Sequence, residues 1–299
     1  MMHRPFAVFV AMTLVACTNE PRVAAHDSVA VIDTGYVAVD GGRLYYESAG
    51  TGAPVLLIHG GNLDRRMWDD QFELLRKQFR VIRYDARGYG RSSSADAPFA
   101  AHDDLAALFH GLGLTRASLI GLSLGGRIAM DFALAHPDMV DRLVLAAPGI
   151  SGGTWAKDGD TLWIAEAIAA GQRGDSVAVA LAWLKSAYIN SALKPPAQAE
   201  RLRQISIDNA RFWMGMLRHQ DLEREANPPA AGRLRELKAP ILLLVGGADT
   251  PFILDVARAI TREAPNVRRV DLAGIGHMIN LEAPERFNTE VVQFLSASR

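Results

Sequence analysis

The sequence has little of three features that would each point to a particular class of protein. It holds a single cysteine, so no intrachain disulfide can form. Its 32 Lys and Arg residues nearly balance its 33 Asp and Glu residues, and they form no basic stripe that would attract nucleic acid. Its apolar run from Phe6 to Ala16 spans about eleven residues, too few to cross a bilayer as a helix. With 49% hydrophobic residues among 299, the chain is predicted to be a soluble globular protein with a sizeable core.

The apolar run near the N-terminus has the layout of a secretory signal, because a basic start precedes it and small residues follow it. The tetrapeptide Leu14-Val15-Ala16-Cys17 also resembles a bacterial lipobox. The resemblance implies a signal peptide over residues 1–16 and lipidation of Cys17. Since Thr18 rather than Asp follows, it also implies a place on the periplasmic side of a Gram-negative outer membrane. A single lipid would be the only membrane contact. The alternative is a soluble periplasmic or secreted protein cut after Ala25.

Beyond a polar segment at residues 17–34, predicted to be a tether, apolar strands alternate with amphipathic helices. Strands are predicted at Tyr36 to Val39, Arg43 to Glu47, Val55 to Ile58, Arg80 to Tyr84, Ala117 to Gly121, Arg142 to Leu145, Pro240 to Val245 and Val267 to Leu272. Helices are predicted at Arg66 to Lys77, Ala100 to Gly113, Leu124 to His136, Ile253 to Glu263 and Ala283 to Ser296. This alternation is typical of an α/β fold with a mostly parallel sheet flanked by helices. The core is predicted to comprise residues 35–149 and 238–299.

Residues 150–237 separate the two parts of the core and lack β-branched runs. Their periodicity predicts helices at Thr161 to Ala170, Ser176 to Tyr188 and Ala197 to Leu217. A helical cap inserted there follows a strand, at the carboxyl edge where α/β proteins bind ligands. Its large apolar residues either pack the cap onto the core or line a substrate pocket: Trp155, Trp163, Trp183, Trp213, Met214 and Met216.

The segment Gly121-Leu122-Ser123-Leu124-Gly125 has the layout of a nucleophile elbow. A strand runs into a serine flanked by glycines, and a predicted helix follows. Small residues at 121 and 125 let the chain turn sharply and expose the serine hydroxyl. Ser123 is therefore the candidate nucleophile.

A serine hydroxyl needs a base that takes its proton during attack. Of the eight histidines, His277 follows the last predicted strand in a glycine-rich loop, at the edge where Ser123 lies. Asp249 follows the strand before it and is the candidate acid that would orient His277. Asp255 competes for this role, but it falls inside the next helix, where it would serve the first turn. The loop at residues 146–149 holds no carboxylate.

The loop His59-Gly60-Gly61-Asn62 follows the strand that ends at Ile58. Its small residues let backbone N–H groups approach a substrate, so Gly61 and Leu124 are the candidate donors of an oxyanion hole. We interpret His59 as a brace for this loop rather than as a catalytic group.

Together these motifs resemble the capped, single-domain α/β-hydrolases from about Tyr36 to the C-terminus. The order of nucleophile, acid and histidine matches that fold. The stretch from Asp85 to Ser92 resembles its Asp-x-Arg-Gly-x-Gly-x-Ser loop, in which Asp85 and Arg87 would form bracing ion pairs. Gly276-His277, with the stretch from Glu282 to Phe287, resembles the segment around its histidine.

The resemblance narrows the chemistry. Haloalkane dehalogenases and epoxide hydrolases of this fold use aspartate where this chain has Ser123, and proline iminopeptidases differ at Ala86 and around the serine. We expect hydrolysis of a small or medium carboxylic ester or lactone through an acyl-enzyme, without metal or organic cofactor. One alternative is carbon–carbon hydrolysis of dienoic ketones of the meta-ring-fission type. The other is a non-catalytic hydrolase fold that acts as a ligand receptor or interaction module. The expected partner is a small-molecule substrate, not nucleic acid.

Overall fold

The computed structural model describes residues 1–2, 31–153, 162–212, 214 and 222–297. All but the first two residues of the predicted signal peptide, together with Cys17 and most of the tether, lie outside these residues. Val31–Arg299 forms one compact unit. Within the described ranges, no helix has the length and apolarity needed to cross a membrane.

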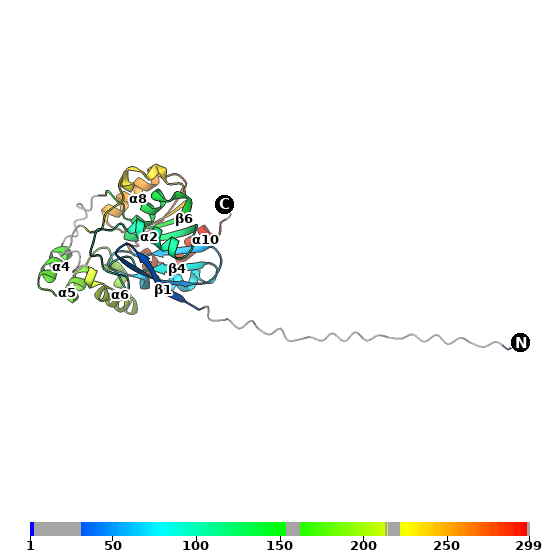
Figure 1. The fold of residues 1–299 in the computed structure, drawn as a ribbon, viewed down its shortest axis with the longest axis horizontal. Coiled ribbons are helices and arrows are strands. Elements are labelled where there is room, and N and C mark those ends of the chain that lie inside the picture. The colour runs from blue at the N-terminus through cyan, green and yellow to red at the C-terminus, as the bar shows by residue number, and fades with distance from the viewer. Residues whose placement is uncertain (3–30, 154–161, 213, 215–221, 298–299) are drawn as a thin grey trace. The chain divides into compact units, whose positions relative to one another are not determined.

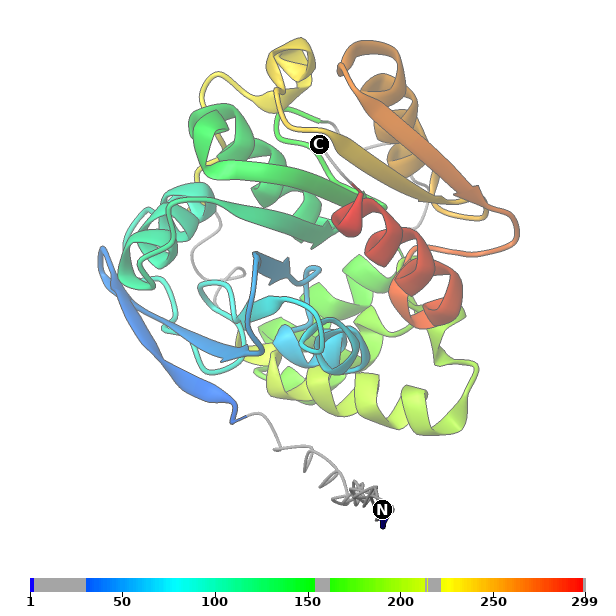
Figure 2. The same cartoon turned by 90° about the vertical axis from the view of Figure 1, so that its right-hand side faces the viewer.

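An eight-stranded sheet forms the centre of this unit, in the order β1-β2-β4-β3-β5-β6-β7-β8. Its strands are β1 (Asp33–Val39), β2 (Gly42–Ala49), β3 (Pro54–Ile58), β4 (Arg80–Tyr84), β5 (Ala117–Leu122), β6 (Val140–Ala146), β7 (Ile241–Gly246) and β8 (Val267–Leu272). The β1–β2 and β2–β4 pairs are antiparallel, and all other pairs are parallel. β1, in blue, and β8, in orange, form opposite edges (Figure 2). The mostly parallel sheet agrees with the predicted fold class.

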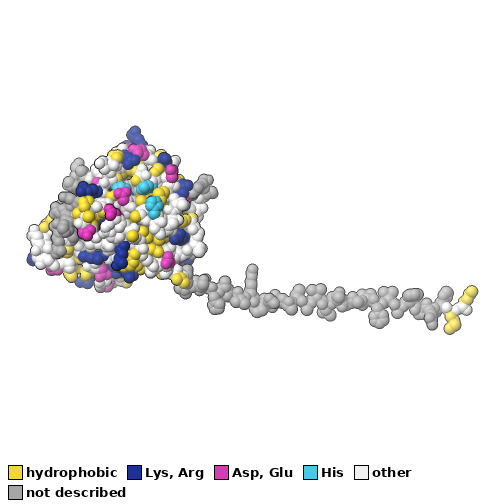
Figure 3. All heavy atoms as spheres, viewed as in Figure 1, with side chains coloured by type: hydrophobic (Ala, Val, Ile, Leu, Met, Phe, Trp, Pro, Cys, Tyr) yellow, Lys and Arg dark blue, Asp and Glu magenta, His cyan; other side chains and the backbone are white. Residues whose placement is uncertain are grey.

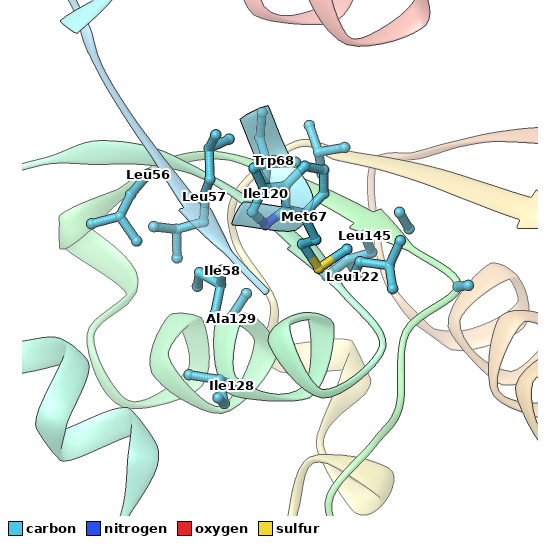
Figure 4. Packing of buried hydrophobic residues seen from close by; sticks show 14 of the residues in the cluster. Leu56, Leu57, Ile58, Met67, Trp68, Ile120, Leu122, Ile128, Ala129 and Leu145 are labelled. Atoms are coloured by element: carbon cyan, nitrogen blue, oxygen red, sulfur yellow. The ribbon is translucent and has the colours of Figure 1, made fainter. Parts of the chain in front are cut away.

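The central strands are buried because helices cover both faces of the sheet. Every residue of β5 and β7 is buried, as expected of central strands that are covered on both faces of a parallel sheet. The main covering helices are α1 (Asp69–Leu75), α2 (Ala101–Gly111), α3 (Leu124–Ala135), α8 (Pro251–Glu263) and α10 (Pro284–Ser296). Residues of β3, β5, β6 and α3 pack together in Figure 4, and all of them are inaccessible or nearly so. This packing fixes the ends of the strands, where the candidate residues lie.

Helices predominate between β6 and β7. The described part contains α4 (Leu162–Gln172), α5 (Ser176–Trp183), a 3-10 turn η3 (Asn190–Leu193) and α6 (Pro196–Asp208), and the three α-helices lie together at the lower left of the compact unit in Figure 1. The helix predicted from Ala197 to Leu217 is wrong in one respect: it breaks at Asn209, after which residues 210–212 and 214 are helical again. The side chain of Asn209 bonds to groups outside the helix, and these contacts override the local periodicity.

Two smaller differences concern the ends of the unit. β1 begins at Asp33, so Asp33 and Thr34 pair with β2 instead of belonging to the predicted tether. A short helix, α9 (Ile279–Glu282), precedes α10 and has no counterpart among the predicted helices. Basic and acidic side chains are interspersed over the face shown in Figure 3, as the balanced composition suggests.

Candidate active site

Ser123 lies in a sharp turn between β5 and α3. Its backbone has φ 55° and ψ −112°. For any residue other than glycine, this conformation is strained and raises the free energy of the folded state. The flanking glycines make the turn possible, because a Cβ on Gly121 would lie 2.2 Å from the carbonyl oxygen of Gly125. A Cβ on Gly125 would lie 2.1 Å from the carbonyl oxygen of Ile58. No other residue type fits at either position without moving the backbone.

His277 and Asp249 are brought together at the ends of neighbouring strands. His277 Nδ1 lies 2.9 Å from Asp249 Oδ2 and 3.1 Å from Oδ1. Their side chains are 1% and 0% exposed, so the pair is shielded from water. Asp249 Oδ1 also accepts a hydrogen bond from the Thr250 backbone N–H, at 2.7 Å. Both of these contacts involve Nδ1 of the imidazole. Among the described residues, the other ring nitrogen, Nε2, has no hydrogen-bond partner and is available to one.

Close backbone packing holds the two loops against each other. Ala248 N–H donates to the carbonyl oxygen of Ile275 at 2.9 Å. A Cβ on Gly246 would lie 2.0 Å from the carbonyl oxygen of Gly276, so only glycine permits this approach. Ser123 lies at the same carboxyl edge of the sheet, two strands from β7. Asp255, the competing acid, instead forms an exposed ion pair with Arg258 inside α8.

The glycine loop after β3 lies against the turn at Ser123. A Cβ on Gly60 would lie 3.8 Å from Ser123 Cβ, and one on Gly61 would lie 3.9 Å from Leu124 Cβ. The loop therefore brings Gly61 beside Leu124, the two residues whose N–H groups are the candidate oxyanion donors.

His59 is fully buried and braces this loop. Its Nδ1 lies 2.8 Å from the Gly60 carbonyl oxygen, and its Nε2 accepts from the Ala86 backbone N–H at 2.9 Å. Burial lowers the pKa of His59 below its usual value, which keeps the ring neutral, as the hydrogen bond accepted by Nε2 also requires. These contacts agree with the interpretation of His59 as a structural residue.

Ion pairs support the loop that follows β4. Asp85 accepts hydrogen bonds from Arg65 Nη1 at 2.9 Å and from the Arg91 backbone at 2.8 Å, and it is inaccessible to solvent. Arg87 pairs with Asp104 at 2.6 Å. The contacts of Asp85 and Arg87 therefore agree with the bracing role that the sequence predicts for both residues.

Between β6 and β7, aromatic rings form a series that leads to His277. The rings of Trp163 and Trp183 lie 5.2 Å apart, Trp183 stacks on Tyr188 at 6.2 Å, and Tyr188 meets His277 edge to face at 4.9 Å. Met214 is partly buried against the core. The other residues considered for pocket lining, Trp155, Trp213 and Met216, lie outside the described residues.

Tyr188 and Asn209, in the segment between β6 and β7, were not among the predicted site residues: Tyr188 contacts His277, and Asn209 contacts Asp64 and Gly90 in two loops of the core. Neither belongs to a motif, and only the folded chain shows which loops they contact. Among the described residues, no group of three or more His, Cys, Asp or Glu side chains is arranged to hold a metal ion.

Comparison with known proteins points to one family. A model described as the alpha/beta hydrolase family matches residues 55–290. A 2-hydroxy-6-oxononadienedioate/2-hydroxy-6-oxononatrienedioate hydrolase of Paraburkholderia phymatum is 31% identical over 266 residues, which cover 85% of this chain and 91% of that protein. The solved enol-lactonase of Burkholderia xenovorans aligns with a TM-score of 0.70 at 26% identity, over 88% of this chain and 100% of that one. The thermophilic esterase of Thermogutta terrifontis aligns with a TM-score of 0.70 at 28% identity, over 88% and 98%. The predicted α/β-hydrolase fold is confirmed.

Proposed function

Because the chain belongs to the alpha/beta hydrolase family, we propose that it is a serine hydrolase that cleaves a small or medium carboxylic ester or lactone. The observation that carries the proposal is the buried hydrogen bond between His277 and Asp249, at the sheet edge where Ser123 occupies its strained turn. Two buried side chains that share a proton in this way match the base and orienting acid of a serine triad.

In the proposed reaction, Ser123 Oγ attacks the substrate carbonyl carbon while His277 Nε2 takes its proton. Asp249 holds Nδ1–H, fixes the ring tautomer and stabilises the imidazolium that forms. The N–H groups of Gly61 and Leu124 bind the oxyanion. The imidazolium then returns its proton to the leaving alkoxide, and the acyl-enzyme remains. A water molecule that gives a proton to His277 attacks the acyl carbon and releases the acid and Ser123. Catalytic hydrogen bonds are often long before substrate binds, so the Ser123–His277 contact is expected to tighten in the complex.

Carbon–carbon hydrolysis is the second candidate. The relative from Paraburkholderia phymatum is named for a dienoic keto acid with two carboxylates, the kind of ketone that such a reaction would cleave. The enol-lactonase and the esterase among the solved structures favour acyl–oxygen cleavage instead. A serine triad serves either reaction, so the substrate must decide between them.

The test combines active-site labelling with a substrate panel. A fluorophosphonate probe should label the wild-type domain stoichiometrically and leave Ser123→Ala unlabelled. Aryl esters of increasing chain length, lactones and ring-fission ketones, assayed in parallel, should show the highest kcat/KM for an ester or a lactone. A highest value for the ketones would establish the second candidate. No labelling and no turnover would point to a non-catalytic receptor or interaction module.

We further propose that the enzyme is exported and anchored through a lipid on Cys17. The support is the signal-like sequence and the tetrapeptide that ends at Cys17. Mass spectrometry of the mature N-terminus should find acylated Cys17 in the membrane fraction, and Cys17→Ser should release the protein from it. An unmodified N-terminus after Ala25 would contradict the anchor.

A further inference from the structure

The loop that carries His277 is held by a carboxylate that the proposed reaction does not use. Glu282, the last residue of α9, accepts a hydrogen bond from the Gly276 backbone N–H at Oε2, at 2.9 Å. Its Oε1 accepts from the Met278 backbone N–H at 3.1 Å. These N–H groups belong to the residues on either side of His277, so one side chain holds the backbone both before and after the imidazole.

The loop also packs directly on this carboxylate. A Cβ on Gly276 would lie 3.0 Å from Glu282 Oε1 and 2.5 Å from Ser191 Oγ. The carboxylate therefore touches the backbone next to His277, and a displacement of Glu282 would break its hydrogen bonds to the N–H groups on both sides of that residue. A shift of about 1 Å in a catalytic group can cost on the order of 100-fold in rate.

The third hydrogen bond to Glu282 comes from the segment between β6 and β7. Ser191, in η3, donates its hydroxyl proton to Glu282 Oε1 at 2.8 Å. Three residues earlier, Tyr188 meets the ring of His277, and its hydroxyl oxygen lies 3.4 Å from Thr250 Oγ1. Residues 188–191 therefore contact His277, Glu282 and the residue after Asp249.

We propose that Glu282 is a positioning residue for His277, and that Ser191 makes this position depend on how the segment between β6 and β7 is docked. The inference rests on the proposed function, because it assigns Glu282 a role through the base of that reaction. A carboxylate is suited to the task, since its two oxygens can accept all three hydrogen bonds. A glutamine has only one amide oxygen. Its NH2 group would face the N–H of Gly276, and because both groups are donors, no hydrogen bond could form between them.

The experiment compares Glu282→Gln and Ser191→Ala with wild type, and uses exposed Glu285→Gln as a matched control. With the best aryl ester of the panel, Glu282→Gln should lower kcat about 10- to 100-fold and leave KM within about twofold. Ser191→Ala removes one hydrogen bond and should lower kcat about threefold to tenfold. Glu285→Gln should match wild type.

A second readout distinguishes positioning from general stability. In the wild-type protein, the proton on His277 Nδ1, held by Asp249, should give a far-downfield ¹H NMR resonance. That resonance should broaden or move in Glu282→Gln, and to a smaller extent in Ser191→Ala, while thermal unfolding of Ser191→Ala stays close to wild type. Unchanged kcat and an unchanged resonance in both folded variants would overturn the proposal. If Glu282→Gln does not fold, Ser191→Ala alone decides by the same two measurements. Absence of fluorophosphonate labelling in wild type would refute the proposed function itself, which separates the two failures.

Discussion

Replacing Asn209 with alanine should undock the segment between β6 and β7 from the loops beside the site. Asn209 is 1% exposed and makes three hydrogen bonds. Its Nδ2 donates to Asp64 Oδ2 and to the Ile205 carbonyl oxygen, both at 2.8 Å, and its Oδ1 accepts from the Gly90 backbone N–H at 2.7 Å. The side chain thus joins the end of α6 to two loops of the core.

The magnitude follows from these contacts. A buried hydrogen bond contributes about 1 kcal/mol net, and one to a charged group about 2 kcal/mol, so the three together contribute about 3 to 4 kcal/mol. Asp64 keeps its ion pair with Arg66, at 2.7 Å, so the substitution leaves no unpaired buried charge to raise this figure. The loss is a large part of a typical stability of about 5 to 15 kcal/mol.

Urea unfolding at pH 7 should show this loss in Asn209→Ala, and hydrogen exchange should show earlier opening in α6 than in β5. Asn190→Ala, an exposed asparagine of the same segment, is the matched control and should stay within about 0.5 kcal/mol of wild type. Asn209→Asp should be at least as unstable at pH 7, since it places a carboxylate next to Asp64, and should recover as the pH falls and one of the two is protonated. A loss below about 1 kcal/mol in Asn209→Ala would refute the reasoning.

Three further predictions follow from the site. Asp249→Asn should lower kcat about 10³- to 10⁴-fold with folding preserved, whereas a near-normal rate would identify another carboxylate as the acid. Gly125→Ala should lower the free energy of unfolding by about 2 kcal/mol or more, because its Cβ would lie 2.1 Å from the Ile58 carbonyl oxygen; an unchanged unfolding midpoint would contradict this. His59→Asn should remove part of the acid sensitivity of folding. Burial keeps the pKa of His59 low, so the unfolded chain takes up a proton below about pH 6.5 that the folded protein does not, at a cost to wild type of up to about 1.4 kcal/mol per pH unit. Urea unfolding at pH 7.5 and pH 5.5 should therefore give a smaller difference for the variant, and equal differences would show that His59 does not titrate this way.

The sequence predicts the parts of the site that depend on strand ends. β5 and β7 are largely apolar strands, and the carboxyl ends of parallel strands lie at a common edge, so Ser123 and Asp249 were expected on the same side of the sheet. The turn at Ser123 was also predictable, because the glycines at 121 and 125 are the residues that the crowded backbone requires. The pairing of β7 with β8 places the loops that carry Asp249 and His277 side by side, where the two side chains form their hydrogen bond.

Contacts made by single polar side chains across long sequence separations were not predictable. Residues 197–217 have a helical period that continues through Asn209, and the break appears because its amide finds Asp64 and Gly90, which lie more than 100 positions earlier. Glu282 lies in a stretch that resembles a family motif, but its hydrogen bond from Ser191, 91 positions earlier in the chain, forms only when η3 packs beside α9. In both cases, hydrogen bonds to distant parts of the chain determine the local structure, which sequence propensity alone does not specify.

The segment between β6 and β7 contacts the residues on both sides of the proposed site. Substitutions at these contacts should therefore affect catalysis differently from substitutions elsewhere in the segment. On one side, Phe212 stacks on Tyr89 at 4.1 Å, and Tyr89 meets His59, the brace of the glycine loop after β3, at 5.0 Å. On the other, Ser191 holds Glu282 beside the histidine loop. Substitutions at these contacts should therefore act on kcat, through the placement of the reacting groups. Substitutions on the exposed face of α4, which carries exposed Leu162 and Ile164, should leave kcat for a small aryl ester unchanged. A segment that acted only as a substrate filter would instead change KM and selectivity at every position, so kcat measured across both sets of variants distinguishes a filter from a part of the catalytic framework.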